Sequence, residues 1–248
     1  MMKSAETKSA TDVQTLIAEL VQANHILFDQ GVVDAFGHVS VRSSTDTNRF
    51  LLARNMAPGH VTDDDVLEFT LDGEVVNSKG QRVYLERFIH GEIYRIRPDV
   101  NSVVHSHSHS IVPLSVVRDN PLRAMFHMAG FIGAGAPVFD LADYAGGETD
   151  LLISDQDRGR ALAGAFTESD IVLMRGHGST VVGGSIQQAV YRAVYAELNA
   201  QYQVQASRLG NVKFLSPGEC RTCSQNIEAQ VARPWNLWCE EAAANRAK

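Results

Sequence analysis

The sequence has few cysteines and no long apolar run. Its three cysteines all lie after residue 219, which argues against a small secreted scaffold built on disulfides and favours a reducing compartment. No apolar stretch approaches the roughly 20 residues that a membrane-spanning helix needs. The first ten residues lack the apolar core of a secretion signal. The sequence therefore predicts a cytoplasmic protein.

Clustered positive charge is also missing. The formal net charge is −7, and lysine and arginine form no block. A nucleic-acid surface normally has a basic stripe, so we expect neither a nucleic-acid nor a membrane partner. No G-x-G-x-x-G follows a strand, which excludes the usual dinucleotide-binding fold. What remains is ordinary globular composition, 44% hydrophobic and 21% charged over 248 residues, enough to bury a sizeable core.

Hydrophobic spacing predicts interspersed helices and strands. Apolar residues at helical spacing predict helices over 11–31, 84–97, 154–162 and 185–209. Short apolar or alternating runs predict strands at HVSVR, RFLLAR, VLEFTLDGEVV, SVVH, PVFD and IVLM. We therefore expect an α/β fold with a layered, mixed or antiparallel sheet. Residues 11–248 are expected to form one catalytic domain, after a flexible N-terminal tail over residues 1–10.

The run VVHSHSHS is the most informative part of the chain. His105 and His107 follow two apolar valines, and residues i and i+2 of an extended chain point the same way. Their imidazoles therefore converge at one strand end. Neutral imidazole is a common ligand for zinc, manganese, iron and cobalt. The pair predicts a divalent metal site, and a polar loop with a chance repeat is the alternative.

A third imidazole follows a later apolar strand. His177 lies in RGHGST, directly after IVLM, and its flanking glycines let the backbone turn sharply. Catalytic metal sites usually have three protein ligands and an open position. We expect His177 to complete a site for one divalent ion per subunit, zinc, manganese, cobalt or iron. An incidental histidine in a glycine-rich turn is the alternative.

Glu86 is the candidate acid/base. It lies in the first turn of the helix predicted over 84–97, where the helix dipole favours a negative charge. The apolar neighbours Leu85 and Phe88 indicate a partly buried helix start, which would raise the pKa of Glu86 towards a useful range. An exposed glutamate at a helix start is the alternative.

Glu86, the His105/His107 pair after RPDVNSVV and the later GHG of His177 resemble the class II aldolase/adducin family, over about residues 12–210. The resemblance implies a three-layer α/β/α sandwich with a mostly antiparallel central sheet. It implies that the three histidines bind the metal and that Glu86 transfers the proton and can also reach the metal. It further implies a homotetramer with active sites at subunit boundaries. His109 has no constant counterpart in the family pattern and is not expected to be a ligand.

The phosphate-binding pattern of the sugar-phosphate members of this family is altered. Their G-N-x-S becomes GHVS with His38, and LLARNMAPG has Arg54 where small hydroxyls are expected. Their S-S-E becomes Tyr84-Leu85-Glu86. Small donors and backbone amides suit a phosphate, whereas tyrosine and leucine provide a flat or apolar wall. A phosphorylated sugar is therefore disfavoured.

The strings DAFGHVSVR, YLERFIHGEIYR, VVHSHS, HMAGFIG and LMRGHG resemble a decarboxylase subgroup of the family. It includes 3-hydroxy-2-methylpyridine-4,5-dicarboxylate decarboxylase and the dihydroxyphthalate and dihydroxy-cumate decarboxylases. The resemblance implies removal of one carboxylate from a hydroxylated aromatic or heteroaromatic acid, with a metal-stabilised enolate that Glu86 protonates. Arg54 and His38 are the candidates to hold a carboxylate, and Tyr84 and His127 are the candidates to line the ring pocket.

Two alternatives remain. An aldolase, epimerase or dehydratase of an unphosphorylated carbonyl compound would use the same metal and the same glutamate. A structural protein like adducin would share the fold without the metal chemistry, and the presence of all three histidines and Glu86 argues against it.

The C-terminal region offers a weaker signal. Cys220 and Cys223 form C-x-x-C without a second pair or a redox-fold context, so we expect no second metal or redox site there. Trp235 and Trp238 are expected to anchor the C-terminal segment on the body or on a neighbouring subunit.

Overall fold

The centre of the protein is a seven-stranded sheet in the order β3-β2-β1-β4-β7-β6-β5. The computed structural model describes residues 2–166 and 168–247. The strands are β1 (His38–Arg42), β2 (Arg49–Ala53), β3 (Val66–Thr70), β4 (Ser102–Ser106), β5 (Val138–Phe139), β6 (Ile171–Met174) and β7 (Gly178–Gly183). Only the β5–β6 pair is parallel among these strands. The mostly antiparallel sheet confirms the predicted α/β class.

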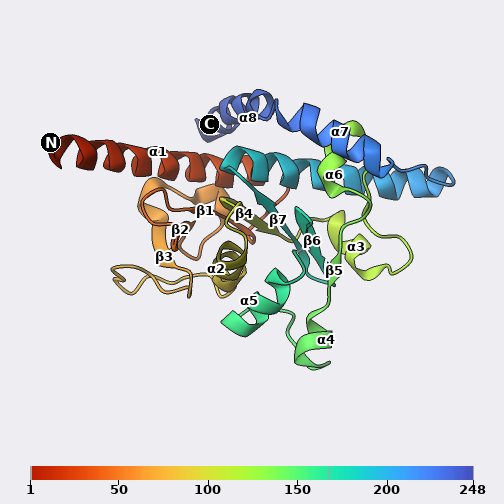
Figure 1. Ribbon diagram of the computed structural model, residues 1–248, viewed down its shortest axis with the longest axis horizontal. Helices are drawn as coiled ribbons and strands as arrows, with labels where there is room; N and C mark the ends of the chain where they lie inside the picture. Colours follow the sequence, from red (N-terminus) through yellow and green to blue (C-terminus); the bar gives the residue numbers. More distant parts are fainter. Residues whose placement is uncertain (1, 167, 248) are drawn as a thin grey trace.

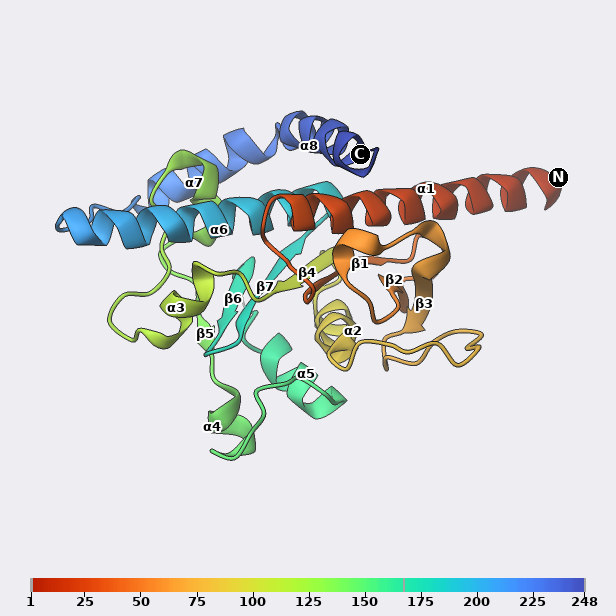
Figure 2. The same cartoon turned by 180° about the vertical axis from the view of Figure 1, so that it is seen from behind.

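Helices cover both faces of the sheet (Figures 1 and 2). One face carries α1 (Met2–Asp29) and α6 (Ile186–Leu209), with α7 (Pro217–Glu228) and α8 (Ala232–Arg246) packed outside them. The other face carries α2 (Arg87–Ile96) and α5 (Gln156–Ala163). The remaining helical segments are α3 (Ile111–Val116), α4 (Leu141–Ala145), η1 (Pro58–His60), η2 (Asp63–Asp65) and η3 (His127–Ile132). The arrangement is the expected three-layer sandwich.

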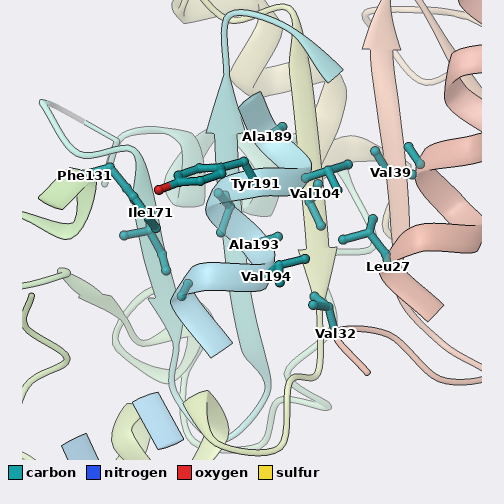
Figure 3. Packing of buried hydrophobic residues seen from close by; sticks show 14 of the residues in the cluster. Leu27, Val32, Val39, Val104, Phe131, Ile171, Ala189, Tyr191, Ala193 and Val194 are labelled. Carbon is teal, nitrogen blue, oxygen red and sulfur yellow. The ribbon is translucent and has the colours of Figure 1, made fainter. Parts of the chain in front are cut away.

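Successive residues of the central strands enter opposite cores, because side chains alternate across a sheet. Val104 of β4 packs with Val39 and with Leu27 of α1, in the core that α6 also joins (Figure 3). Val103, its neighbour, lies in the second core with Ile93 of α2. Both faces of β1 and β4 are therefore buried, and their ends lie inside the molecule.

The structure corrects several predicted boundaries. Helix α1 begins at Met2 and not at residue 11, while the flexible tail expected over residues 1–10 stays a prediction. Helix α2 begins at Arg87, so Glu86 is its N-cap and not a first-turn residue. Helix α5 begins at Gln156 and not at residue 154, and its N-cap is Asp155, whose side chain accepts the Arg158 N–H. The extent of a single catalytic domain over residues 11–248 stays a prediction.

The C-terminal helices complete the outer layer. Trp235 and Trp238 are buried in the core that contains α1 and α6, so they anchor α8 on the body as expected. Cys220, Cys223 and Cys239 are free thiols. In the described part of the chain, no helix has the length and apolarity needed to cross a bilayer.

Candidate metal centre and active site

Four side chains from three separate segments meet at one end of the central strands. His105 is in β4 and His107 follows it, while His177 lies in the turn between β6 and β7. Glu86 immediately precedes α2. Strands β4 and β7 pair with Ser106 opposite Ser179, and this register brings the β6–β7 turn beside the histidine pair.

Gly178 permits the close approach of β7 to β4. A Cβ atom built on it would lie 2.0 Å from the carbonyl oxygen of Ser106 and 3.1 Å from the Cα of His107. Any side chain here would force the two strands apart. The glycine after His177 in the GHG motif is therefore required by packing, whereas the glycine before it, Gly176, has the positive φ of 65° that favours glycine in the turn.

The four potential ligand atoms lie within 4.8 Å of one another. His107 Nε2 is 3.2 Å from His105 Nε2 and 3.0 Å from His177 Nε2. A carboxylate oxygen of Glu86 is 3.4 Å from His177 Nε2 and 3.6 Å from His105 Nε2. Three imidazole nitrogens and one carboxylate oxygen thus converge on a single point, as sequence reasoning expected for the histidines.

This donor set fits a divalent metal ion. Burial lowers the pKa of His105 and His107, which keeps both rings in the neutral form that binds metals. Side-chain nitrogens that lie this close together are typical of ligands arranged around a shared cation. His109 is exposed and does not belong to the cluster.

The pKa of Glu86 differs from the sequence expectation. Burial raises it, as predicted, but the hydrogen bond with His177, the electrostatic effect of the His105 and His177 rings and the Ile153 N–H outweigh burial. The net effect lowers the pKa to about 2. The Ile153 N–H donates to Oε1 at 2.9 Å. The prediction of a raised pKa is therefore wrong, and Glu86 is a carboxylate at neutral pH.

A cavity of about 300 Å³ opens directly over this cluster. Its walls combine small, apolar and aromatic side chains with Glu86 and two of the three histidines of the cluster. The lining residues are Ala35, Phe36, Gly37, His38, Asn55, Met56, Ala57, Tyr84, Leu85, Glu86, His105, His107 and Leu152. The volume suits one small ring compound.

Two of the four predicted substrate residues line this cavity. The ring of His38 lies 4.7 Å from that of Tyr84 and 5.0 Å from that of His105, between centroids. The Tyr84 hydroxyl donates to the Met56 carbonyl at 2.5 Å, so this hydroxyl already has a partner within the chain. Burial raises the pKa of Tyr84 to about 12.

The structure does not bring the other two to the cavity of their own chain. Arg54 donates to Asp65 at 2.7 Å and does not line the cavity. His127 is exposed at the start of η3 and contacts Phe126. The sequence did not indicate that Asn55 and Met56, which follow Arg54 in the loop after β2, line the cavity. The irregular backbone of that loop gives no periodic signal in the sequence.

Comparisons with known proteins agree with this geometry. Residues 18–204 match the family described as the Class II Aldolase and Adducin N-terminal domain. The decarboxylase tropJ of Talaromyces stipitatus is 39% identical, over 91% of this chain and 93% of that protein. The 3,4-dihydroxyphthalate decarboxylase of Arthrobacter keyseri is 28% identical, over 76% and 77%.

The fold agrees with solved structures as well. L-fuculose 1-phosphate aldolase from Glaciozyma antarctica superposes with a TM-score of 0.77 at 22% identity, over 96% of this chain and 93% of that one. At this identity the likeness concerns the fold alone. The two sequence relatives and the fold together support a decarboxylase or aldolase-like lyase.

Proposed function

The chain belongs to the class II aldolase and adducin family, and from that premise we propose that it is a divalent-metal-dependent decarboxylase of a hydroxylated aromatic or heteroaromatic carboxylic acid. The observation that carries the proposal is the convergence of Glu86 and three imidazoles below a cavity with an aromatic and apolar wall. The names of the two decarboxylase relatives support the reaction type.

The cluster would hold the ion through His105, His107 and His177, with Glu86 beside it. A divalent ion there supplies a Lewis acid for negative charge that develops on a substrate oxygen. The donor set accepts zinc, manganese, cobalt or iron, so the identity of the metal stays open.

Glu86 moves the proton in the proposed reaction. As a carboxylate within the cluster, it accepts the proton of a substrate hydroxyl and returns it to the ring carbon that bears the leaving carboxylate. When the bond to that carboxylate breaks, CO2 leaves and the electron pair stays with the ring and its oxygen. The Ile153 N–H on Oε1 fixes the carboxylate so that Oε2 faces the reacting groups.

The cavity walls offer contacts that would hold a ring. Tyr84 and Phe36 offer aromatic faces, and Leu85 and Leu152 offer aliphatic contact. Such walls suit a flat organic ring and lack the small hydroxyl donors that bind a sugar phosphate. This favours the aromatic acid over a phosphorylated sugar.

The homotetramer with sites at subunit boundaries remains part of the proposal. Phe36 and Leu85 border the cavity yet are 66% and 60% exposed. Large apolar side chains exposed together usually mark a contact surface, and an adjacent subunit would cover them and close the cavity. Light scattering coupled to size-exclusion chromatography measures the number of chains.

A screen for CO2 release tests the proposed reaction. The metal-loaded protein is incubated with hydroxylated benzoates, phthalates and pyridine carboxylates, with Glu86→Gln as the inactive control. Release of CO2 by the unmodified protein alone supports the proposal. Cleavage of an unphosphorylated hydroxy-aldehyde or keto acid, with no CO2 from any aromatic acid, would instead establish the aldolase alternative.

A further inference from the structure

A chain of hydrogen bonds runs from the cavity into the second core. His38 Nδ1 is 2.7 Å from His90 Nε2, and His90 Nδ1 is 2.6 Å from Ser40 Oγ. Ser40 Oγ is 2.7 Å from the Tyr94 hydroxyl. His90 and Ser40 are fully buried and Tyr94 is nearly so. Only His38 of these four lines the cavity.

The secondary structure explains why these side chains meet. His38 and Ser40 are two residues apart on β1, and His90 and Tyr94 are four residues apart on α2. Each pair therefore lies on one face of its element. The helix packs on the strand so that the four polar groups alternate along a single line, surrounded by apolar residues such as Phe50.

Tyr94, at the buried end of this chain of hydrogen bonds, determines which group donates in each of them. Burial raises the pKa of Tyr94, despite the hydrogen bond with Ser40, the nearby Arg42 and the Val103 N–H that acts on the phenol oxygen, so Tyr94 keeps its proton. Within the described residues, Ser40 Oγ is the only hydrogen-bond acceptor recorded for that proton. Arg42 lies over the Tyr94 ring, 4.7 Å from its centroid, and a guanidinium accepts no hydrogen bond. Tyr94 therefore donates to Ser40.

The remaining hydrogen bonds are donated in the same direction, towards the cavity. Ser40 accepts the hydrogen bond from the Tyr94 hydroxyl, and its own hydroxyl donates a hydrogen bond to His90 Nδ1. Burial lowers the pKa of His90 to about 3, so this ring is neutral and has its single N–H on Nε2, which donates to His38 Nδ1. The proton of a neutral His38 ring is then on Nε2, in a ring that lines the cavity.

We propose that His90, Ser40 and Tyr94 are positioning residues that hold His38 as a fixed neutral N–H donor, which recognises a substrate oxygen adjacent to the oxygen at the histidine cluster. The proposal rests on the proposed function, since it requires an aromatic acid in the cavity. His38 and His105 are directly opposite across β1 and β4, with ring centroids 5.0 Å apart. The two rings are therefore neighbours in the cavity wall, which is the arrangement needed to contact oxygens on neighbouring substituents of one ring.

The charge of the cavity supports this role. Among the described residues that line it, none is a lysine or an arginine. A second acidic oxygen of the substrate therefore meets no cation of this chain, and the His38 N–H is a directed donor in its place. A proton relay along the same chain is excluded, because it would leave a phenolate at buried Tyr94. His38 thus selects substrates by hydrogen bonding and not by proton transfer.

Nitrogen-15 NMR of histidine-labelled, zinc-loaded protein tests the hydrogen-bond direction without any substrate. We expect the Nε2–H tautomer at both His38 and His90. Tyr94→Phe removes the donor that sets the direction, so His38 should shift to a mixture of tautomers, and Ser40→Ala should do the same. Tyr191→Phe is the matched control, because that buried hydroxyl donates to the Met128 carbonyl in the other core. A bare Nε2 on His38 in the unmodified protein, or no change in both chain variants, would overturn the inference.

Calorimetry with two probe ligands tests recognition. The zinc-loaded protein should bind 2-hydroxybenzoate, whose oxygens are on neighbouring carbons, more tightly than 3-hydroxybenzoate. Tyr94→Phe should reduce this preference about tenfold at unchanged zinc content, whereas Tyr191→Phe should keep it. An unchanged preference overturns the inference even where CO2 release succeeds. The expected tautomers and preference without CO2 release from any aromatic acid would overturn the proposed function alone.

Discussion

Glu86 is held by contacts to each of its carboxylate oxygens. Oε1 accepts the Ile153 N–H, and Oε2 lies 3.4 Å from His177 Nε2. An amide at this position keeps the Ile153 contact through its own oxygen but cannot take up a proton. Glu86→Gln should therefore keep the metal and lose about 100-fold to 10,000-fold in turnover, the usual share of a general acid or base.

Metal content by mass spectrometry and CO2 release under identical conditions check this expectation. Full activity in Glu86→Gln would remove Glu86 from the mechanism. Loss of the metal together with activity would show instead that Glu86 acts chiefly as a ligand.

The buried imidazole of His90 makes the stability of the fold depend on pH. Burial lowers its pKa from 6.5 to about 3, although the charge of Glu86 opposes the shift. Below pH 6.5 the unfolded chain binds a proton that the folded chain does not. The free energy of unfolding should therefore fall as the pH drops from about 6.5 towards about 3, by up to ~1.4 kcal/mol per pH unit from this residue.

Urea unfolding of the metal-free protein between about pH 7.5 and about pH 4.5 measures this slope. His90→Gln should be less stable at neutral pH, since Ser40 and His38 lose their shared partner, but its stability should depend less steeply on pH. Replacement of the exposed His60 by glutamine controls for the loss of a histidine outside the interior. Equal slopes in the unmodified protein and His90→Gln would contradict the assignment.

At the scale of elements, local sequence patterns predicted the histidine cluster better than the strands and loops around it. The i, i+2 spacing of His105 and His107 on a strand and the GHG turn of His177 are local features, so their chemistry was visible in the sequence. Strand β7 was not predicted, because GSTVVG is rich in small residues and reads as a loop until it pairs between β4 and β6.

Arg54 lies outside the cavity of its own chain for a non-local reason. Its partner, Asp65, lies in η2 and is fixed there by a capping box with Thr62. Nothing in the sequence around Arg54 indicates that contact. The hydrogen-bond chain of His38 was likewise hidden, because it joins a strand and a helix that are about fifty residues apart.

The approach of β7 to β4 gives a prediction about a single glycine. In Gly178→Ala the added carbon would lie 2.0 Å from the Ser106 carbonyl oxygen, so the strands must separate where His105, His107 and His177 converge. We expect a loss of about 2–3 kcal/mol in stability and a clear loss of metal affinity.

Chemical denaturation and metal titration measure the two effects. Gly147→Ala is the matched control, since a Cβ there meets no atom within 4 Å. A Gly178→Ala protein with unmodified stability and metal affinity would show that the two strands are not held at contact distance.

At the scale of the whole molecule, one bound ion would join segments that are far apart in the chain. Glu86 precedes α2, His105 lies in β4 with His107 just after it, and His177 lies in the β6–β7 turn. An ion that binds only the folded protein stabilises it by about 2.7 kcal/mol at a free concentration of 100 Kd. Chelation should therefore lower the melting temperature of the entire domain and not only remove activity.

Differential scanning fluorimetry with chelator and with added zinc, manganese or cobalt measures this stabilisation. His107→Ala should lose it, because His107 Nε2 lies 3.2 Å and 3.0 Å from the other two imidazole nitrogens and is central to the cluster. His109→Ala should keep it, since His109 is exposed on the same loop and outside the cluster. A protein that purifies without metal and melts at the same temperature with every added ion would favour the adducin-like structural alternative, because the fold would then stand without the centre that the four side chains form.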